Sequence, residues 1–232
     1  MKILALGIHP DDDEVGCGGT IVLAARSGHD VTVVDLSPGG SSSNGSLEDR
    51  AKEAAEAARI MGVSRRYNLG LPDTRIQSEN DEQAGVIVAC IRKERPSLVL
   101  VPSSDDPHPD HSAGGRLVER AVYLAAVHGY ARGEVAWRAA HVLVYPGRTD
   151  FDPDVVFDVS STHDVKLKSI LAHATQFRPG EGRAPTPLNS PGFLGVVEAR
   201  ARTHGRRIGV LFGEGFRSPR PIGLADFRIF GG

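Results

Sequence analysis

Short apolar segments with the character of buried strands alternate along this chain with segments of helical spacing. Such alternation is typical of a doubly wound, mainly parallel sheet with helices on both faces. We therefore predict a Rossmann-like α/β fold, and a length of 232 residues suits one domain covering 1–232. The predicted strands are 3–8, 31–36, 67–71, 98–101, 142–145, 155–159 and 208–212, and the predicted helices are 13–27, 46–61, 81–95, 112–127, 162–176 and 190–204.

Composition and charge narrow the classes of partner. Charged residues make up 24% of the chain, the formal net charge is -2, and no basic stripe is present, so we expect no nucleic-acid partner. No apolar stretch approaches the ~20 residues of a membrane helix, and the N-terminus lacks signal-peptide features, so we expect no membrane partner. Cys17 and Cys90 lack a C-x-x-C spacing, which favours a reduced, cytoplasmic setting. A small molecule remains the expected partner.

Two clusters of histidine and acidic residues directly follow predicted strands. The segment HPDDDE at 9–14 follows the first strand, and DDPHPDH at 105–111 follows the strand that ends at Val101. An open parallel sheet binds its ligands outside the carboxyl ends of its strands. We therefore expect both clusters to lie side by side at the edge of the sheet where a site should form.

The residue types in these clusters suit a metal. Histidines and carboxylates without thiolates are typical of hydrolytic Zn²⁺ sites, which use three protein ligands and keep one position for water. Two histidines and one carboxylate also form the set of non-haem Fe(II) enzymes, so Fe²⁺ is an alternative. Capping of the next helix explains one acidic residue but leaves the run 11–14 without a counter-charge, which a bound cation supplies.

The glycine-rich segment GCGG at 16–19 has a phosphate-binding interpretation that we reject. A dinucleotide fingerprint would need a third glycine at position 21, where the chain has Ile21, and only Asp35 matches the usual acidic residue. We interpret the small side chains as letting the helix approach the sheet and the metal closely.

Taken together, the motifs resemble those of the LmbE-like (PIG-L) family of zinc-dependent N-deacetylases. The resemblance implies a single LmbE-like deacetylase domain, and length and motif order most resemble the branch with the bacillithiol-biosynthesis deacetylase, which hydrolyses N-acetylglucosaminyl-malate. It is carried by HPDDD at 9–13, GCGGT at 16–20 and HPDH at 108–111, and extends through Arg50, LPD at 71–73, TQF at 175–177 and GEGF at 213–216.

The resemblance also implies roles for individual residues. Asp11 would be the general base, and His108 the general acid or the group that stabilises the oxyanion. Asp110 would orient His108. The implied metal ligands are His9, Asp12 and His111.

The substrate contacts and two departures from the family pattern also follow from the resemblance. Arg50 and Asp73 would contact the sugar or its aglycone. Asp13 stands where the family has Glu, which shortens its reach. Phe193 aligns with a tyrosine of close relatives whose hydroxyl polarises the substrate carbonyl, so another donor would have to stabilise the oxyanion here.

The function that the resemblance implies is removal of the acetyl group from an N-acetylglucosaminyl compound, in the first place N-acetylglucosaminyl-malate. Alternatives are a deacetylase of another N-acetyl sugar, such as a chitin oligomer or an antibiotic intermediate, and a non-catalytic module that binds a metal or a nucleotide. Structural zinc is normally four-coordinate, so three ligands beside a spare carboxylate favour the enzyme. Relatives in this branch form homo-oligomers, often hexamers, so we expect a homo-oligomer.

Overall fold

The computed structural model describes residues 1–131 and 135–224. Its elements in chain order are β1 (Lys2–Gly7), α1 (Asp12–Arg26), β2 (Asp30–Asp35), α2 (Leu47–Met61), β3 (Arg65–Asn68), α3 (Asp81–Glu94), β4 (Leu98–Pro102), α4 (Pro109–Ala125), β5 (His141–Tyr145), β6 (Val155–Asp158), α5 (His163–Ala172), α6 (Ala174–Phe177), α7 (Phe193–Arg207) and β7 (Gly213–Phe216). Five strands form a parallel sheet in the order β3-β2-β1-β4-β5, which confirms the predicted fold class.

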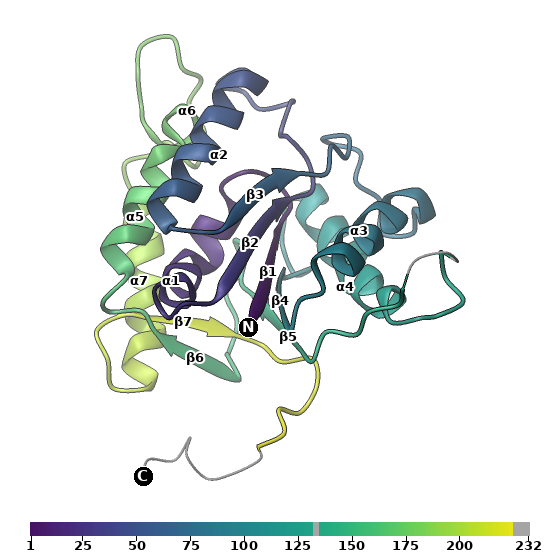
Figure 1. Ribbon diagram of the computed structural model, residues 1–232. Helices are drawn as coiled ribbons and strands as arrows, with labels where there is room; N and C mark the ends of the chain where they lie inside the picture. The colour runs from purple at the N-terminus through teal and green to yellow at the C-terminus, as the bar shows by residue number, and fades with distance from the viewer. Residues whose placement is uncertain (132–134, 225–232) are drawn as a thin grey trace.

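Helices cover both faces of this sheet. In Figure 1, α3 and α4 lie on one side of it, and α1, α2, α5 and α7 on the other. Leu4 and Leu6 of β1 join the core on the α3/α4 side, whereas Ile3 and Ala5 join the core against α1. Because both faces of β1 are buried, its sequence is a continuous apolar run without polar alternation.

The start of α2 follows the signal in the sequence. The hydroxyl of Ser46 accepts from the Asp49 amide at 3.1 Å, and the Asp49 carboxylate accepts from the Ser46 amide at 3.0 Å. This reciprocal pair is a capping box, and it satisfies two amides that the first helical turn leaves without partners. Gly62 ends the helix in the left-handed conformation, at φ 71°.

Ser46→Ala should lower the free energy of unfolding by about 1 kcal/mol, because the Asp49 amide loses its acceptor. Urea denaturation measures the change. Ser64→Ala is the control, since Ser64 is exposed and its hydroxyl has no recorded hydrogen bond within the described chain. We expect less than about 0.5 kcal/mol for the control, and an equal loss in both variants would contradict the capping role.

The prediction of a strand at 208–212 is wrong. This segment lies in a turn, and its Ile208 and Leu211 are 45% and 58% exposed. The strand is β7, which follows it and pairs antiparallel with β6 in a separate two-stranded sheet. A Cβ at Gly213 would lie 2.7 Å from the Gly205 amide of α7, so glycine, not an apolar side chain, permits this close packing.

Three helix predictions differ from the structure by more than one residue, and the helix predicted over 190–204 is α7, Phe193–Arg207. α4 begins at Pro109 instead of residue 112, because His108 accepts from a backbone amide as the N-cap and proline suits the first helical position. The helix predicted over 162–176 is divided into α5 and α6 at His173, whose backbone leaves the helical region at ψ 60°. The early start of α4 matters for the site because it places the second histidine cluster on the first helical turn.

The glycine-rich start of α1 lets this helix pack tightly, as we predicted. A Cβ at Gly16 would lie 2.3 Å from the Tyr145 ring of β5, and one at Gly19 would lie 2.9 Å from Val159. The helix is kinked at Cys17, and the Glu214 carboxylate accepts from the amides of Gly19 and the next residue at 2.9 and 2.7 Å. β7 is thereby joined to the helix that carries the first acidic cluster.

Candidate metal centre and active site

The two histidine clusters meet at the carboxyl ends of β1 and β4. These strands are neighbours in the sheet, and the strand order reverses between them. The rings of His9 and His111 have centroids 5.4 Å apart, and Nδ1 of His9 lies 3.3 Å from Nε2 of His111. The expectation that residues 102 positions apart would lie side by side is therefore confirmed.

Asp12 completes a group of three donors. One atom each of His9, Asp12 and His111 lies within 4.8 Å of the others. Oδ1 of Asp12 is 3.4 Å from Nε2 of His111, and its Oδ2 accepts from the His9 amide at 2.8 Å. Two imidazole nitrogens and one carboxylate oxygen at this separation could hold one divalent cation.

The outward nitrogen of each imidazole has a carboxylate partner. Nε2 of His9 lies 3.1 Å from Oδ1 of Asp73 and 3.6 Å from Oδ2 of Asp110, and Nδ1 of His111 lies 3.4 Å from Oδ1 of Asp106. A carboxylate at one ring nitrogen holds the proton there, which leaves a lone pair on the other. The lone pairs thus belong to the two nitrogens that face each other, and this donor chemistry fits a metal.

Asp110 differs from its expected role. Its carboxylate accepts from the Thr74 amide at 2.7 Å and faces His9, not His108. The backbone amide of Asp110 instead donates to Nδ1 of His108 at 3.2 Å. The reason is the helical start at Pro109, which turns the Asp110 side chain away from the N-cap residue while its amide points back at it.

The Asp11 carboxylate is buried beside the three donors. Asp11 is the N-cap of α1 in a left-handed conformation at φ 116°, and its exposed fraction is 6%. Its Oδ2 accepts from Nη2 of Arg50 at 3.2 Å. Burial raises the pKa of Asp11 to about 6, although the charge of Arg50 opposes the shift. A carboxylate with this pKa can accept a proton near neutral pH and release it again.

His108 lies beside both histidines of the donor group. Its ring centroid is 4.6 Å from that of His111 and 5.5 Å from that of His9. Because Nδ1 accepts from a backbone amide, the proton of the neutral ring is on Nε2. Burial and the neighbouring His111 and His9 lower the pKa of His108, so the ring can act as a neutral N–H donor.

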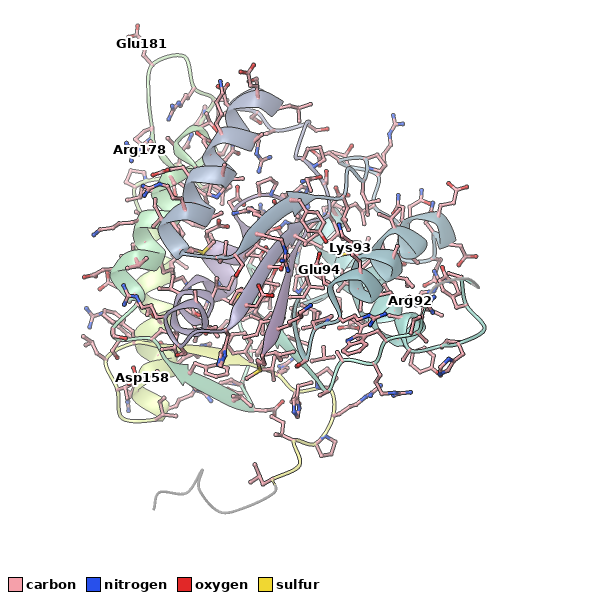
Figure 2. The ribbon with its side chains drawn as sticks, in the orientation of Figure 1. Arg92, Lys93, Glu94, Asp158, Arg178 and Glu181 are labelled. Carbon is pink, nitrogen blue, oxygen red and sulfur yellow. The ribbon has the colours of Figure 1, made fainter. Side chains whose placement is uncertain are left out.

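A cavity of about 320 Å³ opens over these residues. Its wall includes residues of the loop 178–192, whose Arg178 stands near the loop's start and whose Glu181 extends from its tip (Figure 2). Asn44 joins this loop to the loop 38–46, since its side-chain amide exchanges hydrogen bonds of 2.9 and 2.8 Å with the backbone of Ala184. The loops 38–46 and 178–192 therefore form one wall of the cavity.

The expected substrate-contact residues all line this cavity. Arg50 is buried and donates to the carbonyls of Gly39 and Pro10 as well as to Asp11, and Asp73 accepts from His9 and from the Ser41 amide at 2.6 Å. Both side chains thus have protein partners that we did not foresee, and their contacts with a sugar stay predictions. Phe193 packs against Phe177, with ring centroids 5.3 Å apart, and offers no hydroxyl to the cavity.

A buried ionic network supports the first cluster from behind. Arg66 of β3 contacts both Glu14 and Asp35, and Nε2 of His173 lies 3.2 Å from Oε1 of Glu14. Burial alone would raise the pKa of Glu14, but Arg66 and His173 lower it. Asp13 is fully buried without a hydrogen-bond partner among the described residues, and burial, Asp35 and Glu14 raise its pKa well above the ordinary value. Of the acidic run, Glu14 is thus balanced by Arg66 and His173, and Asp11 by Arg50.

Three residues that line the site were not singled out from the sequence. Asp106 contacts His111 and also accepts from the amides of His108 and Arg148 at 2.9 and 2.7 Å, so it fixes three parts of the site. Its place in the motif DDPHPDH was the signal that could have identified it. Arg148 and Arg200 line the cavity, but no motif marks either of them.

Comparison with known proteins identifies the family. Residues 4–122 match the PIG-L family, which is described as GlcNAc-PI de-N-acetylase. The chain belongs to this family. It is therefore an N-acetyl amino-sugar deacetylase, as the motifs led us to expect, and the family is metal-dependent. No helix within the described residues has the length and apolar character needed to cross a membrane.

Individual relatives cover most of the chain. The diacetylchitobiose deacetylase of Thermococcus kodakarensis is 32% identical over 188 residues, which are 76% of this chain and 70% of that protein. A probable N-acetyl-alpha-D-glucosaminyl L-malate deacetylase 2 of Bacillus subtilis is 28% identical over 190 residues, 75% of this chain and 82% of that protein. Both substrate classes thus occur among relatives of similar identity.

Solved structures agree with the fold over nearly its whole length. A conserved protein of Thermus thermophilus has a TM-score of 0.88 and 34% identity, with 97% of each chain covered. The N,N'-diacetylchitobiose deacetylase of Pyrococcus horikoshii, complexed with an inhibitor, has a TM-score of 0.81 and 27% identity, with 94% of this chain and 83% of that chain covered.

Proposed function

We propose that this deacetylase is zinc-dependent and that its substrate is an N-acetylglucosaminyl conjugate, in the first place N-acetylglucosaminyl-malate. The observation that carries the proposal is the meeting of three donor atoms, from His9, Asp12 and His111, beside the buried Asp11 carboxylate. Metal ligands next to a spare carboxylate are typical of hydrolytic centres. Two relatives described as probable N-acetyl-alpha-D-glucosaminyl L-malate deacetylases support the choice of sugar conjugate.

The proposed metal ligands are Nδ1 of His9, Nε2 of His111 and the carboxylate of Asp12. A bound Zn²⁺ would lower the pKa of water towards about 7 and polarise the amide carbonyl of the substrate. Fe²⁺ suits the same donor set and is the alternative metal. Asp73, Asp110 and Asp106 hold the ligand imidazoles in the required tautomers through their outward nitrogens.

Asp11 acts as the general base in this proposal. It takes a proton from the attacking water and then returns it to the amine nitrogen as the C–N bond breaks, so acetate and the free amine are released. The backbone holds Asp11 in place because it precedes Asp12, and Arg50 fixes one of its oxygens at 3.2 Å. General-base catalysis of this kind contributes on the order of 10²–10⁴-fold to the rate.

His108 stabilises the negative oxygen of the tetrahedral intermediate. Its Nε2 proton is available because the Asp110 amide occupies Nδ1. A donor already oriented towards developing charge lowers the barrier without reorganisation. In this proposal His108 fills the role that the family resemblance implies for a tyrosine at the position of Phe193, because the Phe193 side chain has no hydrogen-bond donor.

Acetate release from a panel of substrates tests the proposed function. The metal-loaded enzyme should release acetate from N-acetylglucosaminyl-malate with a higher kcat/KM than from N,N'-diacetylchitobiose or free N-acetylglucosamine. The diacetylchitobiose deacetylases among the relatives make chitobiose the principal competing substrate. Faster turnover of chitobiose would replace the malate conjugate as substrate, and no acetate from any N-acetylglucosaminyl compound would reject the proposed function.

A further inference from the structure

Two arginines line the cavity without a carboxylate partner. Neither Arg148 nor Arg200 has a carboxylate within 4.0 Å in the part of the chain that the structure describes. The one recorded side-chain hydrogen bond of Arg200 runs to the Pro146 carbonyl at 3.5 Å, and the guanidinium of Arg148 has none among the described residues. For Arg200 this is unusual, because a partly buried cation is normally paired with an anion within the protein.

The carboxylates around Arg200 are already engaged elsewhere. Asp150 pairs with His204 at 3.2 Å, Glu214 with Lys166, and Asp106 with the second histidine cluster. Arg200 itself is partly buried, and this burial lowers the pKa of its guanidinium. The charges of these three carboxylates oppose this shift, but none of them lies within 4.0 Å of the guanidinium. An anionic ligand in direct contact with Arg200 would offset the cost of burying this cation.

The face of α7 that lines the cavity carries apolar side chains followed by an arginine. Phe193, Val196, Val197 and Arg200 follow one another at helical spacing and all line the cavity. Val196 is 60% exposed, so this apolar stripe is not fully covered by the protein. A ligand with a short carbon skeleton that ends in a negative charge would cover the stripe and reach Arg200.

Arg148 approaches the same cavity from the loop after β5. The Asp106 carboxylate fixes its backbone amide at 2.7 Å, and a Cβ at Gly147 would lie 2.2 Å from Asp106, so the loop is held close. Arg148, His108 and Arg200 all line the same cavity, so Arg148 stands beside the proposed reaction site.

We propose that Arg200 and Arg148 form a subsite for an anionic group on the aglycone, which selects carboxylate-bearing N-acetylglucosaminyl conjugates over neutral ones. This inference rests on the proposed function, because it describes how the same cavity chooses its substrate. Arginine suits the task, since its planar fork binds a carboxylate through two N–H groups. Arg200 is the principal partner, and the exposed Arg148 contributes less because solvent screens its charge.

Substrates with a charged and with a neutral aglycone test the subsite. For Arg200→Met, kcat/KM on N-acetylglucosaminyl-malate should fall by about 10–100-fold, mainly through KM, as expected for a lost hydrogen-bonded charge pair. On the dimethyl ester of the same conjugate and on N,N'-diacetylchitobiose, the change should stay within about threefold. Arg148→Met should show the same selectivity with a smaller loss, and Arg200→Lys should recover part of the activity.

Arg202→Met is the matched control. Arg202 lies on the same helix but is exposed and pairs with Glu198 at 2.8 Å, so its loss should change none of the three substrates. Equal losses of Arg200→Met on charged and neutral substrates would overturn the proposal, because they would assign Arg200 to general folding or to catalysis. So would a wild-type enzyme that does not distinguish the malate conjugate from its ester.

Binding of L-malate separates failure of the subsite from failure of the proposed function. Calorimetry should detect malate binding to wild type, and Arg200→Met should weaken it by at least about tenfold. Because malate also chelates metals, the measurement is repeated on metal-free protein, where arginine-mediated binding should persist. If malate binds but no acetate is released, the subsite is retained and the proposed substrate is rejected. If acetate is released but the enzyme neither binds malate nor prefers charged substrates, the proposed function is retained and the subsite is rejected.

Discussion

Asp11→Asn should reduce kcat for acetate release by about 10²–10⁴-fold while the metal content of the protein stays unchanged. The amide cannot accept the proton of the attacking water, so the general-base step is lost. Asparagine is the appropriate replacement because Asp11 has φ 116°, a backbone conformation that asparagine tolerates better than alanine does. Its amide oxygen can also accept from Arg50, so the shape of the site should persist.

Asp105→Asn provides the matched control for this change. Asp105 belongs to the second acidic motif but its side chain is exposed, so the same loss of charge should leave kcat within about twofold of wild type. Metal content by atomic emission and the thermal midpoint are measured for both variants. Turnover by Asp11→Asn close to wild type would exclude Asp11 as the base, and loss of metal would instead make it a ligand.

The fold was predictable from the sequence where one physical signal decided each element. Buried parallel strands appear as continuous apolar runs, and the Ser46 capping box marked a helix start that the structure reproduces. The prediction failed at β7, where the sequence is glycine-rich and the neighbouring turn carries the apolar side chains. A strand that forms because glycine permits close backbone contact has no hydrophobic pattern to reveal it.

The site was predictable where its residues stand together in short motifs. His9 and His111 each stand in a dense polar motif after a strand, and parallel topology brings such ends together. The direction of each side chain was not predictable, because it depends on the helix start at Pro109, which turned Asp110 towards His9. Arg148 and Arg200 lack any motif, and only the folded cavity reveals that they face the same space.

His111→Ala should abolish stable metal binding and, with it, acetate release. Removing one of three protein ligands leaves only His9 and Asp12, and the effect on affinity should exceed the 10–100-fold loss that is typical for a residue that merely supports a ligand. Asp73→Asn tests that lesser effect, because Asp73 contacts the outward nitrogen of His9 at 3.1 Å. The proposal thus predicts that metal affinity is highest in wild type, lower in Asp73→Asn and lowest in His111→Ala.

Metal content after dialysis against a competing chelator measures this series, and an exposed histidine, His128, supplies the control variant His128→Ala. The control should retain the full metal content and activity. Restored activity of Asp73→Asn at high Zn²⁺ would show that its defect is affinity alone, whereas His111→Ala should stay inactive. Full metal occupancy in His111→Ala would mean that the other donor group, His9 with Asp73 and Asp110, holds the cation instead. Since that group uses the opposite nitrogen of His9, the two arrangements require opposite tautomers of one imidazole and cannot both bind at once.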